Sequence, residues 1–130
     1  MMGKSAVELV QAAQVQLEGV SPKDAAREIA AGDAVVLDVR EAEEWDHHIA
    51  GAVQVPRGLL ESAADPASPR HKPELDPARR VIVYCRSGAR SALAGVTLEI
   101  MGYENVANLD GGFNAWKEAG LPTAEHNADL

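Results

Sequence analysis

Hydrophobic and polar residues follow two different periodicities along the chain. Some segments repeat apolar residues every three or four positions, which is the spacing of one face of a helix. Other apolar runs are short, continuous and rich in β-branched residues, which is typical of strands buried on both faces. These patterns predict helices over residues 5–19, 21–32, 90–102 and within 111–122, a short helical start at 41–45, and strands over 34–40, 51–56, 80–85 and 105–110.

The second predicted helix has clear boundary signals. Ser21 is suited to cap its N-terminus, Pro22 fits the first helical position, and Gly32 can end the helix. Farther along, residues 57–77 contain prolines at positions 66, 69, 73 and 77. We predict that this segment is a surface loop after about one helical turn, because it is too short to link two domains.

The alternation of strands and helices predicts the fold class. Such a chain forms right-handed crossovers and a mainly parallel sheet that helices cover on both faces. Ligands of these sheets bind beyond the carboxyl ends of the strands. Cys85 lies at such an end, since it closes the apolar run "RVIVYC". A site near Cys85 is therefore the first hypothesis about function.

Composition narrows the classes of partner. The 130 residues are 46% hydrophobic and 25% charged, which is ordinary for one globular domain. The formal net charge of −8 argues against nucleic acid or an anionic membrane as partner. We find no segment of signal-peptide or membrane-spanning type, and a single cysteine predicts a reducing, cytoplasmic setting. The histidines lack metal-ligand spacing, so we expect no metal and no other cofactor.

The residues after Cys85 have the chemistry of an anion site. The chain must curl between the strand and the next helix, and Gly88 permits such a turn. Backbone N–H groups then point into a concavity above the helix N-terminus. A thiol held there, close to Arg86 and Arg90, is expected to have a lowered pKa and to be a reactive thiolate.

A buried, inert cysteine is the alternative, and it is the usual fate of a lone cysteine. The neighbouring residues Arg86, Gly88, Arg90 and Ser91, which all lie in the turn between strand and helix, favour the functional interpretation. A cation in the first turn of a helix is unfavourable for the helix dipole. Arg90 is therefore better explained by a bound anion than by helix stability.

Three segments resemble, in the right order, the signatures of the rhodanese-like sulfurtransferases. They are "VVLDVREAEEWDHHIAGAVQVP", "CRSGARS" and "NVANLDGGFNAWKEAGLP", and the resemblance extends from about Ser21 to Pro122. It implies a three-layer α/β domain with a central, mainly parallel, five-stranded sheet and helices on both faces. We therefore expect a helical extension packed on the domain over 1–20, a rhodanese-like domain over 21–122, and a loose, polar C-terminal tail over 123–130.

The resemblance also implies a reaction. Cys85 is expected to attack the outer sulfur of a small anionic donor such as thiosulfate and to become a persulfide. The terminal sulfur then passes to cyanide, a thiol or a protein acceptor. Arg86 and Arg90 are expected to help bind the sulfonate end of the donor. The residues implied in substrate binding are Arg86, Ser87, Gly88, Ala89, Arg90 and Ser91.

Two alternatives to this reaction remain open. The fold also resembles that of cell-cycle dual-specificity phosphatases and arsenate reductases, but their loop has one more residue between cysteine and arginine. Four residues separate Cys85 from Arg90. The shorter loop makes the concavity of backbone N–H groups, here called the cradle, narrower, which suits one sulfur atom better than a tetrahedral oxyanion. The second alternative is a partner-dependent persulfide carrier or an interaction module, because no second cysteine is present to receive the sulfur from Cys85.

Other residues of the signatures are assigned supporting roles. Asp38 and Arg40 are expected to form a buried ion pair at a strand end near the site. Glu44 precedes Trp45, where some two-domain members of the family have a substrate-binding arginine, and this departure argues against efficient thiosulfate binding. The residues expected to be structural are a Gly111–Gly112 turn and Trp116 as a core anchor.

Overall fold

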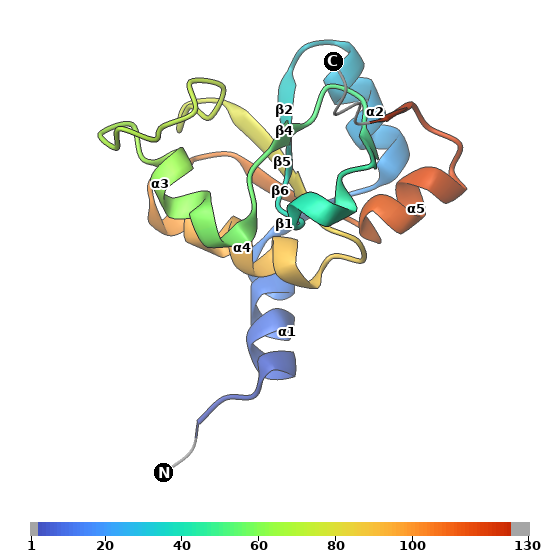
Figure 1. The fold of residues 1–130 in the computed structure, drawn as a ribbon. Helices are drawn as coiled ribbons and strands as arrows, with labels where there is room; N and C mark the ends of the chain where they lie inside the picture. The colour runs from blue at the N-terminus through green and yellow to red at the C-terminus, as the bar shows by residue number, and fades with distance from the viewer. Residues whose placement is uncertain (1–2, 126–130) are drawn as a thin grey trace.

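The computed structural model describes residues 3–125 and consists of a parallel sheet between two layers of helices (Figure 1). The strands, in spatial order, are β1 (Glu18–Val20), β6 (Val106–Leu109), β5 (Arg80–Tyr84), β2 (Ala34–Asp38) and β4 (Val53–Gln54). Every pairing in this sheet is parallel. The helices are α1 (Ala6–Gln16), α2 (Pro22–Ala30), α3 (Leu60–Ala64), α4 (Ala89–Ile100) and α5 (Gly112–Glu118), with 3-10 turns at Ala42–Glu44 and Arg57–Leu59. The predicted α/β fold with a five-stranded sheet is confirmed.

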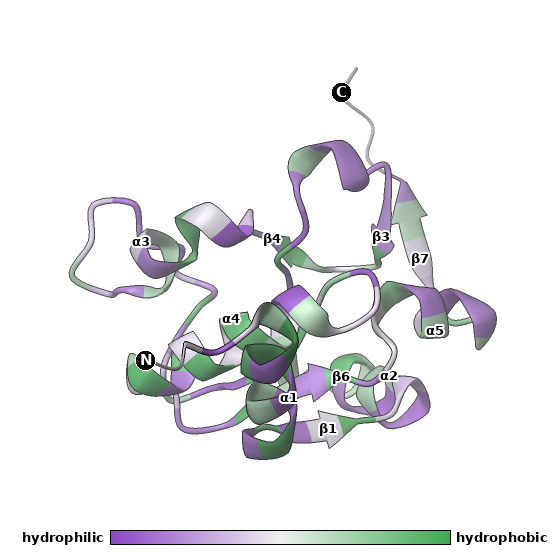
Figure 2. Cartoon of the chain, turned by 90° about the horizontal axis from the view of Figure 1, so that it is seen from below, coloured by the Kyte–Doolittle hydropathy of each residue, from purple (hydrophilic) through white to green (hydrophobic). Residues whose placement is uncertain are grey.

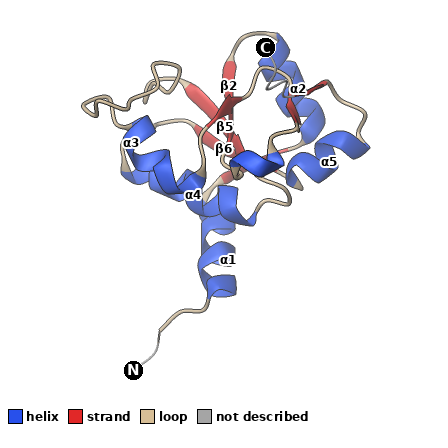
Figure 3. Cartoon of the chain, in the orientation of Figure 1, coloured by secondary structure: helices blue, strands red, loops and turns tan. Residues whose placement is uncertain are grey.

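The helices cover both faces of the sheet, as Figures 1 and 3 show. α3 and α4, with α1 packed against α4, lie on one face, and α2 and α5 lie on the other. Successive residues of β5 enter opposite layers because side chains alternate along a strand. Val81 and Val83 belong to the core under α4, whereas Ile82 and Tyr84 belong to the core under α5.

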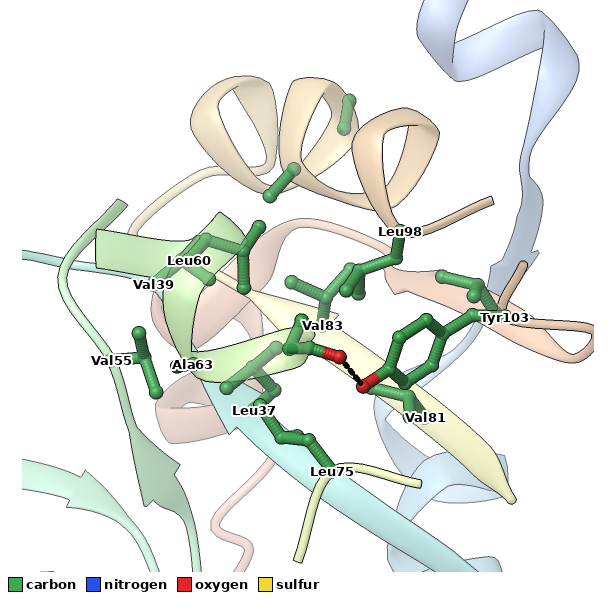
Figure 4. Close-up of a cluster of buried hydrophobic side chains, with 14 of the residues drawn as sticks. Leu37, Val39, Val55, Leu60, Ala63, Leu75, Val81, Val83, Leu98 and Tyr103 are labelled. Atoms are coloured by element: carbon green, nitrogen blue, oxygen red, sulfur yellow. Dashed lines mark hydrogen bonds between the residues drawn. The ribbon is translucent and has the colours of Figure 1, made fainter. Parts of the chain in front are cut away.

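The core under α4 holds that helix on the sheet (Figure 4). Leu98 of α4 and Leu37 of β2 are fully buried there together with Val83. The hydroxyl of Tyr103 donates a hydrogen bond to the carbonyl oxygen of Ala64 at 2.8 Å, which ties the end of α4 to α3. This packing fixes where α4 begins, and that beginning forms the loop after Cys85.

The boundary signals of α2 are confirmed. The Ser21 hydroxyl accepts a hydrogen bond from the Asp24 N–H at 3.1 Å, and Pro22 is the first helical residue. α1 is capped in the same way by Ser5, which the sequence pattern placed at the start of the first helix. Local pattern thus predicted the longer helices within a few residues.

Residues 1–20 contain a strand as well as the expected helix. The helix predicted to Gly19 ends at Gln16, and Glu18–Val20 forms β1, which pairs with β6 at the edge of the main sheet. Gly19 can approach closely there because it has no side chain, as a Cβ atom would lie 2.5 Å from an Asp110 oxygen. β1 is therefore an edge strand of the main sheet.

The start of the predicted loose tail is also a strand. Thr123–Glu125 forms β7, which pairs antiparallel with β3 (His47–Ile49) beside the main sheet (Figure 2). The indole N–H of Trp116 donates to the carbonyl oxygen of Pro122 at 2.9 Å and sets the course of the chain into β7. Trp116 is buried, as expected of a core anchor. The rest of the predicted tail, residues 126–130, lies outside the described residues.

Within residues 3–125, no helix is both long enough and apolar enough to cross a membrane.

Candidate active site

Cys85 lies directly after β5, at the carboxyl edge of the sheet, and its side chain is turned into the loop that leads to α4. The residue is only 1% exposed. Its Sγ atom accepts hydrogen bonds from the N–H groups of Gly88 at 3.2 Å and Ser91 at 3.4 Å. The Ser91 hydroxyl lies 3.3 Å from the same sulfur. Polar donors therefore surround a buried sulfur atom.

The backbone conformation of Gly88 makes this arrangement possible. Gly88 precedes the first residue of α4 and has a φ of 118°, a region that favours glycine. This turn directs the N–H groups at the start of α4 toward Sγ. The cradle expected from the sequence is present, and it is centred on the sulfur atom.

These hydrogen bonds control the pKa of the thiol. Burial raises the pKa of Cys85, but hydrogen bonds from the Ser91 hydroxyl and from the N–H groups of Ser91, Gly88 and Ser87 lower it more, so the net shift is downward. The lowered pKa agrees with the expectation from the sequence. The main cause of the lowered pKa is hydrogen bonding to the thiolate. From the sequence we expected the arginines and the helix N-terminus to be the main cause.

Asn108 of β6 completes the cradle and was not identified from the sequence. The Ser91 hydroxyl donates to the Asn108 Oδ1 atom at 2.7 Å, and the Asn108 Nδ2 group donates to the Gly88 carbonyl oxygen at 3.2 Å. Asn108 is buried. A single amide thus holds both the hydroxyl beside the sulfur and the peptide that turns the loop. The available signal was a polar residue in the middle of an apolar strand, "NVANLD".

The start of α5 supports the other side of the loop. The N–H groups of Phe113 and Asn114 donate to the carbonyl oxygens of Cys85 and Arg86, at 2.9 and 3.1 Å. A Cβ atom on Gly112 would lie 2.6 Å from the Arg86 oxygen, and Gly112 has a φ of 60°. The predicted turn at Gly111–Gly112 is confirmed, and Gly112 also allows α5 to contact the loop.

Both arginines of the loop lie beside Glu44. Arg90 donates two hydrogen bonds to the Glu44 carboxylate, at 2.7 and 3.0 Å, and the Arg86 Nε atom lies 3.8 Å from it. Hydrogen bonding from Arg90 lowers the pKa of Glu44 to about 2, although partial burial opposes this shift. The sequence marked Glu44 as a departure from the family but gave no sign of this pairing.

Asp38 and Arg40 form the expected buried ion pair. The Arg40 Nη2 and Asp38 Oδ2 atoms are 2.8 Å apart, and the Tyr84 hydroxyl donates to the same carboxylate oxygen at 2.8 Å. Arg40 also donates to the His47 carbonyl oxygen, which ties β2 to β3. The pair holds the segments around the site together, and its other side-chain hydrogen bonds are with Tyr84 and His47 rather than with Sγ.

Not every predicted loop residue faces the sulfur. The side chains of Arg86, Ser87 and Ala89 are exposed, so any part they play in the cradle comes from the backbone. Within the described part of the chain, Ser91 is the one predicted loop residue whose side chain forms a hydrogen bond with Sγ. Among residues 3–125, no three His, Cys, Asp or Glu side chains form a group that could hold a metal ion.

Comparison with known proteins identifies the family. A family model described as the rhodanese-like domain matches residues 21–119. The chain belongs to the rhodanese-like family. A curated relative, a sulfurtransferase from Allochromatium vinosum, is 40% identical over 91 residues, which are 69% of this chain and 78% of the relative. Several other curated relatives are longer, and the match covers between 21% and 49% of their length.

Solved structures of similar fold carry names that refer to different activities. The polysulfide-sulfur transferase homodimer of Wolinella succinogenes is 32% identical, with a TM-score of 0.73, and the match covers 92% of this chain and 86% of that one. A Rhodopseudomonas palustris protein of unknown function, named a possible tyrosine phosphatase, is 34% identical with a TM-score of 0.87, covering 95% and 97%. The first name corresponds to the sulfurtransferase alternative and the second to the phosphatase alternative.

Two depressions flank the loop of this rhodanese-like domain. One, of about 170 Å³, is lined by residues that include Gln14, Ser87, Gly88 and Asn108. The other, of about 330 Å³, is lined by residues that include Arg40, Glu44, Arg86, Phe113 and Lys117. The second depression contains both positive and negative side chains, so its charge is not that of a simple anion pocket.

Proposed function

We propose that this protein is a sulfurtransferase that carries a sulfane sulfur as a persulfide on Cys85. The observation that supports this function is the cradle itself. A buried sulfur with a lowered pKa accepts hydrogen bonds from the backbone of Gly88 and Ser91. Such donors stabilise a thiolate and can stabilise the anionic persulfide that replaces it.

The proposed reaction has two steps. The Cys85 thiolate attacks the outer sulfur of a donor, which is thiosulfate or a persulfide, and the S–S bond of the donor breaks. With thiosulfate, sulfite leaves with the electron pair of that bond. An acceptor then attacks the terminal sulfur of the Cys85 persulfide and regenerates the thiolate. Cyanide becomes thiocyanate, whereas an acceptor thiol becomes a new persulfide. The acceptor is external, because the chain has no second cysteine.

Phosphatase activity is the second candidate, because one similar structure is named a possible tyrosine phosphatase. Two observations weigh against it here. Arg90, the residue that would bind phosphate, is engaged by Glu44 through two hydrogen bonds. The pKa of Glu44 is lowered to about 2, so this carboxyl group is ionised and cannot protonate a leaving group. Attack on sulfane sulfur with sulfite as leaving group needs no such acid.

A persulfide carrier that depends on a partner differs from the enzyme only in the acceptor. In both cases Cys85 gains one sulfur, but a carrier releases it only to a particular protein. An interaction module without chemistry would not gain sulfur at all. Transfer of a sulfur atom to Cys85, here called loading, therefore distinguishes the interaction module from the enzyme and the carrier. Turnover with cyanide then distinguishes the enzyme from the carrier.

The decisive experiment is intact-mass spectrometry after incubation with thiosulfate and, separately, with a persulfide donor. We expect the mass to increase by one sulfur atom and to return to its original value when cyanide is added. The Cys85→Ser variant should show no increase, whereas Ser62→Ala, a change in α3 away from the loop, should behave like the unmodified protein. Hydrolysis of a phosphate ester without any sulfur adduct would instead support the phosphatase.

A further inference from the structure

The geometry points to Glu44 as the residue that determines which sulfur donors this site accepts. We infer that Glu44 disfavours donors that carry an oxyanion next to the transferred sulfur, such as thiosulfate, and favours persulfides that lack one. This inference rests on the proposed function and names its substrate class. It follows from the position of Glu44 among the cations of the loop.

Glu44 occupies the hydrogen-bonding groups that an oxyanion would need. Its carboxylate oxygens lie 2.7 and 3.0 Å from the Nη1 and Nη2 atoms of Arg90, in a two-point contact. The same carboxylate is 3.8 Å from the Nε atom of Arg86. Two-point pairing is the geometry with which arginine binds sulfonate or phosphate oxygens. An internal anion is therefore already bound to the cations that flank Cys85.

The Glu44 carboxylate is also held in place by its own turn. Its Oε1 atom accepts a hydrogen bond from the Glu41 N–H at 3.1 Å, which closes the 3-10 turn of Ala42–Glu44. The Glu44 side chain is 17% exposed, so water screens it only in part. A donor that displaced it from Arg90 would have to leave this carboxylate without its strongest partner.

The two donor classes place charge differently. In thiosulfate the outer sulfur is bonded directly to a sulfonate, so an attack by Cys85 brings the oxyanion to the mouth of the loop, beside Glu44. In a persulfide R–S–SH the thiolate attacks the outer sulfur and R–S⁻ leaves with the electron pair, with no oxyanion at that position. Like charges placed side by side disfavour binding. Glu44 therefore penalises the first class more than the second.

The test compares two isosteric variants, Glu44→Gln and Glu74→Gln. Both change the net charge equally, but Glu74 lies in the loop before β5, is exposed and makes no ion pair within the described residues. The loading rate of Cys85 is measured by intact mass with thiosulfate and with 2-hydroxyethyl persulfide, generated in place from the disulfide and sulfide. We expect Glu44→Gln to accelerate thiosulfate loading about tenfold and persulfide loading less than about twofold. Glu74→Gln should change both rates less than about twofold.

A second measurement does not depend on sulfur transfer. Iodoacetate and iodoacetamide alkylate Cys85 by the same chemistry and differ in charge, so the ratio of their rates reports anion exclusion at the loop. We expect this ratio to rise severalfold in Glu44→Gln and to stay unchanged in Glu74→Gln. Glutamine retains an oxygen for the Glu41 N–H, so the turn should stay folded, and an unchanged iodoacetamide rate would verify an intact loop.

The outcomes separate this inference from the proposed function. Equal acceleration of both donors, or equal effects of the two variants, would overturn the role of Glu44. An unchanged alkylation ratio would overturn it too. Failure of every donor to load Cys85 would refute the proposed function alone, and a raised ratio in Glu44→Gln would then still support exclusion of anions by Glu44.

Discussion

At the scale of single residues, the Ser91 hydroxyl carries only one proton, and two atoms compete for it. The structure gives that proton to the Asn108 Oδ1 atom, 2.7 Å away. The Nδ2 group of Asn108 donates to the Gly88 carbonyl oxygen. Rotating the amide by half a turn would place its Oδ1 atom against that carbonyl oxygen, so the orientation of the amide is fixed. Ser91 can therefore donate to a Cys85 thiolate, 3.3 Å away, only by leaving Asn108. Asn108 therefore weakens, without abolishing, the hydrogen bond by which the Ser91 hydroxyl lowers the pKa of Cys85.

This competition makes a prediction with a definite sign. Asn108→Leu removes the competing acceptor, so Ser91 is free to donate to the thiolate and the pKa of Cys85 should fall. Because a lower pKa populates the thiolate at lower pH, the rate of iodoacetamide alkylation should reach its plateau at more acidic pH. Ser91→Ala should raise the pKa and move the plateau the other way.

The control for this prediction is the double variant. If the effect of Asn108 acts through the serine proton, Asn108→Leu should leave the pKa of Cys85 unchanged in the Ser91→Ala background. If the substitution merely loosened the loop around Gly88, it would change the pKa in both backgrounds. Equal shifts with and without the serine hydroxyl would therefore contradict the competition.

At the scale of elements, the sequence predicted what depends on local pattern. The helices, the buried strands and the loop from Cys85 to Ser91 each follow from neighbouring residues, and the structure places them close to the predicted positions. β1, β3 and β7 were missed because each has only three residues and exists through pairing with a distant strand. Such short strands have too little periodicity of their own to be recognised.

The candidate site likewise contains residues that the local sequence predicted and contacts that it could not predict. Cys85 and the residues of its loop could be identified from their order in the chain. The pairing of Glu44 with Arg90 joins residues 46 positions apart, and the contact of Asn108 with Ser91 joins a strand to a helix. Side-chain partners of this kind depend on how β2, β6 and α4 pack together. Sequence pattern alone could not supply them.

The contact between α5 and the active loop can be tested at Gly112. Gly112→Ala should place a methyl group 2.6 Å from the Arg86 oxygen and break the hydrogen bonds from the start of α5 to the loop. We expect a loss of about 2–4 kcal/mol in the free energy of unfolding and at least about a tenfold slower sulfur loading of Cys85. Urea denaturation and intact-mass kinetics measure these two effects.

Gly120→Ala is the matched control for that change. Gly120 also has a positive φ, 70°, but nothing lies within 4 Å of the Cβ position. Gly120→Ala should therefore lower the free energy of unfolding only by the backbone strain, about 1 kcal/mol, and leave the rate of sulfur loading of Cys85 unchanged. Equal effects of the two substitutions on loading would show that α5 does not shape the loop.

At the scale of the whole molecule, the arginines of the sheet and the site are largely paired with carboxylates. Arg80, at the start of β5, contacts Glu18 and Glu28, and Arg90, beyond its end, contacts Glu44. Arg40 is paired with Asp38. The formal net charge of −8 is therefore not offset by a strong positive field at the loop. A doubly charged anion such as thiosulfate approaches a molecule that repels it.

The salt dependence of sulfur loading follows from this distribution of charge. Added salt screens the repulsion between the protein and thiosulfate, so the loading rate should rise about twofold or more between low ionic strength and about 0.15 M. Loading at several sodium chloride concentrations, followed by intact mass, measures this effect, and the iodoacetamide rate should stay constant because that reagent is neutral. A thiosulfate rate that falls with salt would mean that unpaired cations attract the donor and that Glu44 does not neutralise the loop. In Glu44→Gln, where Arg90 is released, the increase with salt should become smaller or reverse.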